Sequence, residues 1–338
     1  MNISPIKKGE HMQRGQSDPI TIRSLHSVIP PFQFKERILK NPANKTRLIE
    51  LFDQYVTKKS DKVLRQLGCS TIHISFEGQC HKIMRKQSSS SSELESNQPE
   101  ADTRLILHAR HALRETNSPV YIYSPSGDTD VIVLCVSLLS DESDRVHIAD
   151  GSGKNMKTYK LSNIIMDDEI RLALVGFHAF TGNDYASSLF GVGKKRAFSL
   201  MVSDERHIGL FQQIGEDIDD LHLEEQLEWA EHFVCKLYSE KKCLSVNDAR
   251  YTLFKKQLVK NKTTNLSRIP PCQSVLRLHL QRASYIAHLW KNSQIPQIDL
   301  PAIDESGWFS DGDIVWTEEE LFPETLSKHV VADEERND

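Results

Sequence analysis

The sequence lacks the features of a membrane-bound or secreted protein. Its 338 residues include no run of 18 apolar residues, and residues 1–16 are polar and basic. The first observation excludes a membrane-spanning helix, and the second argues against a secretory signal. Six cysteines are scattered without a C-x-x-C pair, which favours free thiols in a reducing compartment over zinc or disulfides. We therefore expect an intracellular protein without membrane attachment.

Two further absences narrow the chemistry. The 14 histidines show neither H-x-x-x-H nor H-E-x-x-H spacing, so no zinc motif is predicted. No Gly-x-x-x-x-Gly-Lys-Ser/Thr segment is present, which disfavours an ATP-binding P-loop. We interpret His108 and His178 as core residues or supports for metal ligands rather than as general bases.

The composition is that of an ordinary globular protein, with 38% hydrophobic and 26% charged residues. A net charge of -5 argues against a globally basic nucleic-acid coat but leaves room for a local basic patch. The length allows one large domain or two smaller ones.

Periodicity predicts an α/β core followed by helices. Strands are expected over residues 71–76, 120–123, 145–149 and 156–161, and alternating helices indicate a parallel sheet flanked by helices. The Ser88–Ser92 run indicates a solvated loop. The predicted organisation is a disordered N-terminus (1–25), a core (26–203) with a Ser-rich loop (86–99), a helical region (204–293) and an acidic extended tail (294–338).

Three acidic motifs lie at predicted junctions between strands, turns and helices. They are Glu100-Ala-Asp102, Asp128-Thr-Asp130, and Asp184 in a Gly-Asn-Asp turn. Carboxylates gathered beyond the carboxyl ends of strands suit Mg²⁺ or Mn²⁺, and two such ions can hydrolyse a phosphodiester. Each motif taken alone is better explained as a helix cap. Three of them in one α/β segment favour a metal site.

A glycine- and lysine-rich segment follows Asp184. It contains Gly191, Gly193, Lys194, Lys195 and Arg196 just before and within the start of a predicted helix, over residues 195–202. Backbone N–H groups and the positive end of a helix can bind a phosphate backbone. The alternative is an ordinary turn with a basic helix start.

Together these motifs resemble the flap endonuclease, or XPG-like, structure-specific nucleases of the PIN-like fold. The resemblance covers residues 98–203 and is closer still to uncharacterised, transposon-associated animal proteins. It implies that Glu100, Asp102, Asp128, Asp130 and Asp184 are catalytic metal ligands for two Mg²⁺ or Mn²⁺ ions. It also implies a helix-two-turn-helix clamp over residues 185–203 that grips branched or flapped DNA, with K⁺ at the helix-hairpin. The implied location is the nucleus rather than the cytoplasm.

One departure from that family leaves other functions open. The family supplies two more aspartates from strands before the first acidic motif, and nothing before Glu100 matches them, as though the chain began just after them. An alternative is therefore a catalytically inactive, transposon-derived module that binds nucleic acid or protein. A third is a helical interaction protein built on residues 204–293, in which the basic stretch 255–262 is better explained as a solvated helix face.

Overall fold

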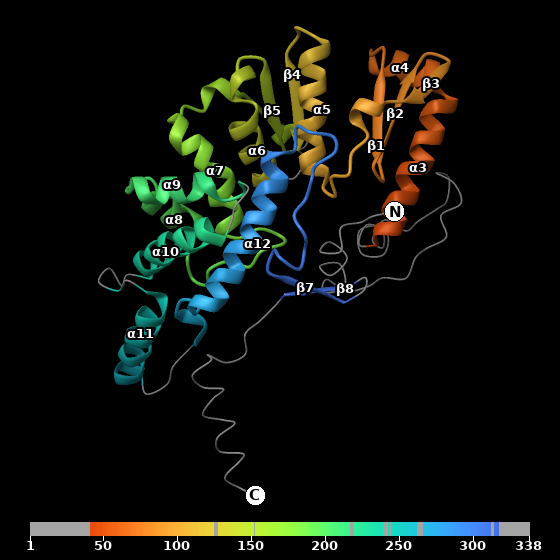
Figure 1. Cartoon of the computed structure of the whole chain (residues 1–338). Helices are drawn as coiled ribbons and strands as arrows, with labels where there is room; N and C mark the ends of the chain where they lie inside the picture. Colours follow the sequence, from red (N-terminus) through yellow and green to blue (C-terminus); the bar gives the residue numbers. More distant parts are fainter. Residues whose placement is uncertain are drawn as a thin grey trace, which may run out of the picture. The chain divides into compact units, whose positions relative to one another are not determined.

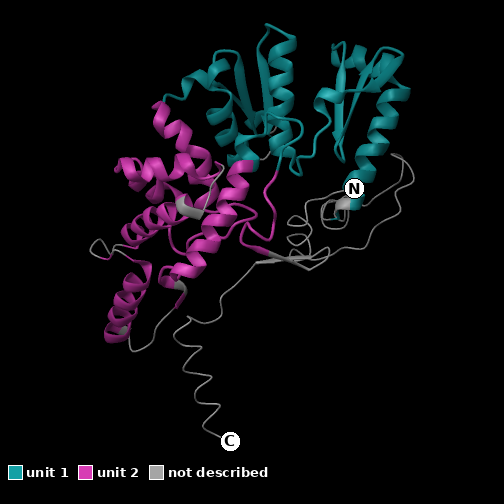
Figure 2. Ribbon diagram, in the orientation of Figure 1, with its two compact units in different colours: residues 1–165, 289–299 teal, residues 166–288, 300–338 magenta. Residues whose placement is uncertain are grey.

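The computed structural model describes residues 41–124, 128–151, 153–216, 220–238, 243, 245–261, 266–311 and 314–317. The predicted disordered segment 1–25 lies outside these ranges. The chain divides into two compact units (Figure 2). Unit 1 comprises residues 1–165 and 289–299, and unit 2 comprises residues 166–288 and 300–338. The boundary between the units lies between Ile165 and Met166, so the predicted core over 26–203 contains parts of both units.

The described part of unit 1 starts with two helices and an antiparallel sheet (Figure 1). A two-residue turn, Glu77-Gly78, joins the first two strands, and both residues have positive φ, as a type I′ turn requires. Val56 packs with Ile74 and Ile83 in the core between helix and sheet. The elements are α3 (Pro42–Lys58), α4 (Ser60–Leu67), β1 (Ile72–Phe76), β2 (Gln79–Met84) and β3 (Gln87–Ser90).

The predicted solvated loop over 86–99 is wrong in its first half. Ser88, Ser89 and Ser90 lie in β3, which pairs antiparallel with β2. Their side chains are exposed, and an edge strand pairs through its backbone without needing apolar side chains. In η2 (Ser92–Leu94), the side chain of Leu94 is buried against Cys80 and Leu107. This segment is therefore part of the fold of unit 1.

The second sheet of unit 1 carries the α/β pattern that the sequence predicts. β4 pairs parallel with β5, and β5 pairs antiparallel with β6, so the described sheet is mixed. α5 packs against both β4 and α6. The elements are α5 (Ala101–Glu115), β4 (Val120–Ser124), α6 (Thr129–Leu138), η3 (Ser140–Glu142), β5 (Val146–Asp150), η4 (Gly153–Asn155), β6 (Lys157–Lys160) and η5 (Leu161–Asn163).

Unit 2 is mainly helical, as predicted. α12 spans the division, because its residues up to His288 belong to unit 2 and those from Leu289 to unit 1. No helix of the described residues is long and apolar enough to cross a bilayer. The elements are α7 (Asp168–Phe180), α8 (Lys194–Met201), α9 (Glu205–Gln213), α10 (Asp220–Leu237), α11 (Val246–Asn261), η6 (Leu266–Arg268), α12 (Gln273–Lys291), β7 (Trp308–Asp311) and β8 (Ile314–Thr317).

Aromatic side chains form the core of unit 2. Phe180 and Phe211 meet edge to face with ring centroids 5.6 Å apart, and Phe211 meets Phe233 at 4.9 Å. Gly176 allows α7 and α9 to cross closely, because a Cβ there would lie 2.2 Å from the carbonyl oxygen of Phe211. This crossing fixes the position of α9 in the unit.

Within the predicted extended tail, residues 308–311 and 314–317 are instead strands. β7 pairs antiparallel with β8. Trp308 is buried and meets Tyr285 of α12 edge to face at 5.4 Å. This contact attaches β7 to α12 within unit 2.

Candidate functional site

The first acidic motif opens α5 in unit 1. Glu100 is the N-cap residue of α5, and Asp102 lies in its first turn. The Glu100 side chain is only 6% exposed, and its Oε2 accepts a hydrogen bond from Nε1 of Trp290 at 3.1 Å. The indole therefore fixes the position of a buried carboxylate. Asp102, two residues later in the sequence, is half-buried.

The second acidic motif opens α6. Asp128 is the N-cap residue, and its Oδ1 accepts a hydrogen bond from the backbone N–H of Asp130 at 3.1 Å. The backbone N–H of Asp128 donates in turn to Oγ of Ser124 at 3.2 Å, which ties the cap to the end of β4. The capping interpretation of Asp128 is thus confirmed. A carboxylate has about four lone-pair sites, so one capping bond leaves others for a cation.

The topology of unit 1 places these residues at one edge of its second sheet. β4 and β5 run parallel, and their pairing ends at Ser124 opposite Asp150. α6 starts just after β4, and α5 reaches β4 through the short connection 116–119, so both helices begin near the carboxyl end of β4 (Figure 1). Ligands of α/β sheets gather at this edge. We call it the acidic edge, defined by Glu100, Asp102, Asp128, Asp130 and Asp150.

Sequence reasoning missed Asp150, which is the last residue of β5. Its place at this edge follows from the parallel pairing of β5 with β4, which residue spacing does not reveal.

The fifth predicted ligand belongs to the other unit. Asp184 is exposed and lies in the loop between α7 and α8 of unit 2. Asn183 shapes this loop, because its Oδ1 accepts hydrogen bonds from the backbone N–H groups of Tyr185 at 2.7 Å and Ala186 at 2.9 Å. The predicted set of five carboxylates is therefore divided, with four in unit 1 and Asp184 in unit 2.

The predicted phosphate-binding segment begins α8. Gly193 is the N-cap residue, and Lys194, Lys195 and Arg196 are exposed in the first turn. A Cβ at Gly191 or Gly193 would meet no atom within 4 Å, so the backbone here is open to a ligand.

Lys194 also has a partner inside unit 2. Its Nζ lies 2.9 Å from Nδ1 of His178, and the ammonium donates this hydrogen bond. His178 is buried, in agreement with its interpretation as a core or supporting residue.

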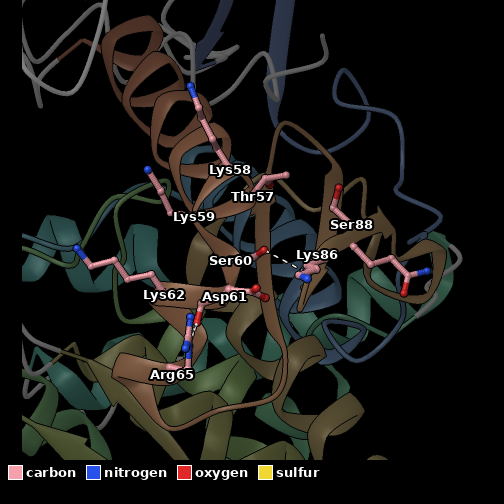
Figure 3. A pocket seen from close by; sticks show the side chains of 10 residues that line it. Thr57, Lys58, Lys59, Ser60, Asp61, Lys62, Arg65, Lys86 and Ser88 are labelled. Carbon is pink, nitrogen blue, oxygen red and sulfur yellow. Dashed lines mark hydrogen bonds between the residues drawn. The ribbon is translucent and has the colours of Figure 1, made fainter.

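Sequence reasoning also missed a basic pocket at the junction of α3 and α4 (Figure 3). The pocket has a volume of about 350 Å³. Ser60 Oγ faces the backbone N–H of Lys86 at 3.3 Å, while the side chains of Lys58, Lys59 and Lys62 extend in different directions (Figure 3). Spread cations of this kind suit an extended polyanion better than a single small anion. The lining is Thr57, Lys58, Lys59, Ser60, Asp61, Lys62, Arg65, Lys86, Gln87 and Ser88.

A third feature that sequence reasoning missed lies in unit 2. The potential ligand atoms of Asp204, His207 and His232 all lie within 4.8 Å of one another. In the part of the chain that the structure describes, this is the one such group of three or more. The available signal was the D-x-x-H spacing of Asp204 and His207 at the start of α9. The H-x-x-x-H and H-E-x-x-H patterns do not include this spacing.

Two histidines, the half-buried His108 and the buried His279, are held in the neutral form. Burial lowers the pKa of His108 in unit 1 to about 4, and its Nε2 lies 2.7 Å from Oγ of Ser75. Burial likewise lowers the pKa of His279 in unit 2 to about 4, and its Nε2 donates to the carbonyl oxygen of Phe180 at 2.8 Å. Such a pKa suits a core group better than a general base near neutral pH.

No family model, curated protein or solved structure matches this chain. The motif resemblance therefore stays a prediction.

Proposed function

We propose that this chain is a divalent-metal-dependent, PIN-like phosphodiesterase that acts on DNA, with its chemistry at the acidic edge of unit 1. The observation that carries the proposal is the position of the two acidic helix starts and Asp150 at the carboxyl edge of parallel strands β4 and β5. This is where α/β sheets bind ligands.

The donors at the acidic edge fit a hard cation. Every candidate ligand there offers carboxylate oxygen, which Mg²⁺ and Mn²⁺ prefer over nitrogen or sulfur. Glu100, Asp102, Asp128 and Asp130 of unit 1 would hold the ions. A bound pair of ions supplies an activated water and stabilises the leaving oxygen of a phosphodiester.

The chain itself positions these carboxylates. The Trp290 indole holds Oε2 of Glu100, and the cap bond to Asp130 holds Oδ1 of Asp128. The positive ends of the α5 and α6 dipoles stabilise negative charge at the same edge. Carboxylates repel one another unless a cation lies between them, so cation binding is expected to draw this set together.

DNA would be held by its backbone rather than by its bases. The open glycine segment before α8 offers backbone N–H groups, and Lys195 and Arg196 add exposed positive charge. The basic pocket of α3 and α4 offers a second cationic surface. Such contacts read shape and charge, which is what branched or flapped DNA presents.

A second candidate function is nucleic-acid binding without catalysis. The basic pocket favours it independently of any carboxylate, since Lys58, Lys59 and Lys62 surround the pocket whether or not a metal is bound. The local roles of Asp128 as a cap and of Glu100 as the partner of Trp290 also suit a purely structural edge.

The deciding experiment is cleavage of a labelled flapped DNA duplex in Mg²⁺ and in Mn²⁺. Asp128→Asn keeps a good N-cap residue but removes the charge. We expect it to lower cleavage by at least about 100-fold, because loss of a ligand exceeds the roughly 10–100-fold effect of changing its supports. The matched control is Glu115→Gln at the exposed opposite end of α5, which should cleave like the parent chain.

Two outcomes would decide against catalysis at this edge. Equal cleavage by Asp128→Asn and the parent would exclude the proposed site. Salt-sensitive DNA binding without cleavage by the parent would select the binding module instead. In that case Lys59→Glu should weaken binding, whereas Lys255→Glu on the predicted solvated face of α11 should not.

A further inference from the structure

The cluster of Asp204, His207 and His232 joins two helices of unit 2. Asp204 is the N-cap residue of α9, His207 lies three residues further on, and His232 comes from α10. Nε2 of His207 lies 3.1 Å from Nδ1 of His232 and 4.0 Å from Oδ2 of Asp204. The three side chains converge although His207 and His232 are 25 residues apart in sequence.

The hydrogen bonds set the proton positions on His207. Its Nδ1 lies 3.3 Å from the carbonyl oxygen of Leu200. A carbonyl only accepts, so Nδ1 carries the proton and the lone pair of Nε2 faces His232 and Asp204. Histidines that bind metals commonly donate their other ring N–H to a backbone carbonyl or carboxylate in this way.

The protonation states also suit a metal ligand set. Burial is the largest cause of the lowered pKa of His207 and of His232, which keeps both imidazoles neutral at physiological pH. The hydrogen bond from Lys236 lowers the pKa of Asp204, which keeps its carboxyl ionised. Two imidazole nitrogens and one carboxylate oxygen form a donor set typical of zinc.

The distances come close to those of a tetrahedral site. Two nitrogens bound to one zinc at about 2.0–2.1 Å lie about 3.3 Å apart, near the 3.1 Å found between His207 and His232. Only Asp204 must approach. Its Oδ1 accepts the capping bond from Arg206 N–H at 3.1 Å, so Oδ2 can move toward an ion while the cap remains.

Lys236 competes for the same carboxylate oxygen. Its Nζ donates to Oδ2 of Asp204 at 2.8 Å, and its ammonium already neutralises the carboxylate that a metal ion would bind. A purely structural network would keep this ion pair and the contact between the two imidazoles. A metal site requires the Lys236 ammonium to release Oδ2 of Asp204.

We propose that Asp204, His207 and His232 bind one Zn²⁺, which displaces Lys236 and links the start of α9 to α10. Binding moves the ring proton of His232 from Nδ1 to Nε2, so no net proton is released from the imidazoles. Water fills the fourth ligand position. The ion stabilises unit 2, and the site is independent of the proposed function at the acidic edge.

The test is a titration of the untagged full chain with Zn²⁺ by calorimetry and with Co²⁺ by visible absorption. With excess Mg²⁺ present to occupy the acidic edge, we expect one equivalent of each ion and the spectrum of four-coordinate cobalt. Asp204→Asn, which keeps the cap, and His232→Gln, at a half-buried position, should each weaken binding by at least about tenfold. The fully buried His207 is left unchanged, so that folding is preserved.

Lys236→Met distinguishes a zinc site from a purely structural network by the direction in which zinc affinity changes. It keeps the apolar stem but removes the competing ammonium, so zinc should bind several-fold more tightly. The control is His222→Gln, an exposed histidine on the same helix, which should bind zinc like the parent. Absence of a one-equivalent transition in the parent would overturn the proposal, as would equal affinities in the parent, His232→Gln and Lys236→Met.

Discussion

The two units carry potential metal ligands in opposite ways. In unit 1, the carboxylates follow one another in ordered sequence motifs, yet Asp128 caps a helix and Glu100 is held by an indole. In unit 2, Asp204, His207 and His232 follow no familiar motif, yet their ligand atoms lie within 4.8 Å. Motif order and spatial convergence are therefore separate kinds of information about a metal site.

The two sets also differ in chemistry. The acidic edge offers only oxygen and suits a hard ion that exchanges with substrate and water. The cluster in unit 2 offers two buried or half-buried imidazoles with one carboxylate and suits zinc. If this comparison is right, substitutions in one unit should leave the metal affinity of the other unchanged.

The largest expected effect comes from Trp290. Its side chain is 1% exposed, so Trp290→Ala should lower the free energy of unfolding by about 3–5 kcal/mol. Trp290→Phe keeps most of the packing and removes the hydrogen bond to Glu100, which should cost about 1.5–3 kcal/mol and lower Mg²⁺-dependent cleavage. Denaturant unfolding and the cleavage assay measure both effects.

The zinc affinity of Trp290→Phe is the control for its effect on cleavage. Trp290 belongs to the part of α12 that is grouped with unit 1, so zinc should bind Trp290→Phe as it binds the parent. A loss of zinc affinity equal to that of Asp204→Asn would show that the two sites are not separate.

The next effect is a pH dependence that each unit should show. Folding lowers the pKa of His279 from 6.5 to about 4, so below pH 6.5 the unfolded chain takes up a proton that the folded chain excludes. Stability is therefore full above pH 6.5 and falls as pH drops toward 4, by on the order of 3 kcal/mol. Equilibrium unfolding as a function of pH measures this loss.

Two variants show which unit loses stability as the pH falls. His279→Leu should flatten the pH dependence of unit 2, and His108→Gln that of unit 1, because His108 also has its pKa lowered to about 4. An unchanged slope in His279→Leu would mean that His279 is not the group that titrates.

The smallest effect separates the cap of α6 from its proposed chemistry. Asp128→Ala removes the bond to the Asp130 N–H and should destabilise the chain by about 1 kcal/mol, whereas Asp128→Asn should cost only a few tenths. Thermal unfolding of the two variants measures the difference. If both lose cleavage while only the alanine variant loses stability, the charge of Asp128 has a role beyond capping.

The sequence predicted most elements because their signals are local. The helix after Glu100 follows from apolar periodicity, and the helix start at Asp128 follows from its cap before an apolar run. The strand through Ser88–Ser90 was missed because it pairs through its backbone with β2, which residue type does not reveal. The convergence of His207 with His232 depends on how α9 packs on α10 and could not be read from spacing.

The acidic edge was predicted only in part for a similar reason. Asp150 joins it through the parallel pairing of β5 with β4, which no single motif contains. Conversely, motif order grouped Asp184 with residues that the structure assigns to the other unit.

The central claim is that the acidic edge of unit 1 binds divalent cations. Electron paramagnetic resonance of Mn²⁺, titrated into the chain in the presence of one equivalent of Zn²⁺ for the proposed site in unit 2, tests it most directly. The account predicts bound Mn²⁺ in the parent and in Glu115→Gln, and a loss of at least about tenfold in affinity in Asp128→Asn. Identical Mn²⁺ binding by all three chains, or no binding by the parent, would contradict it.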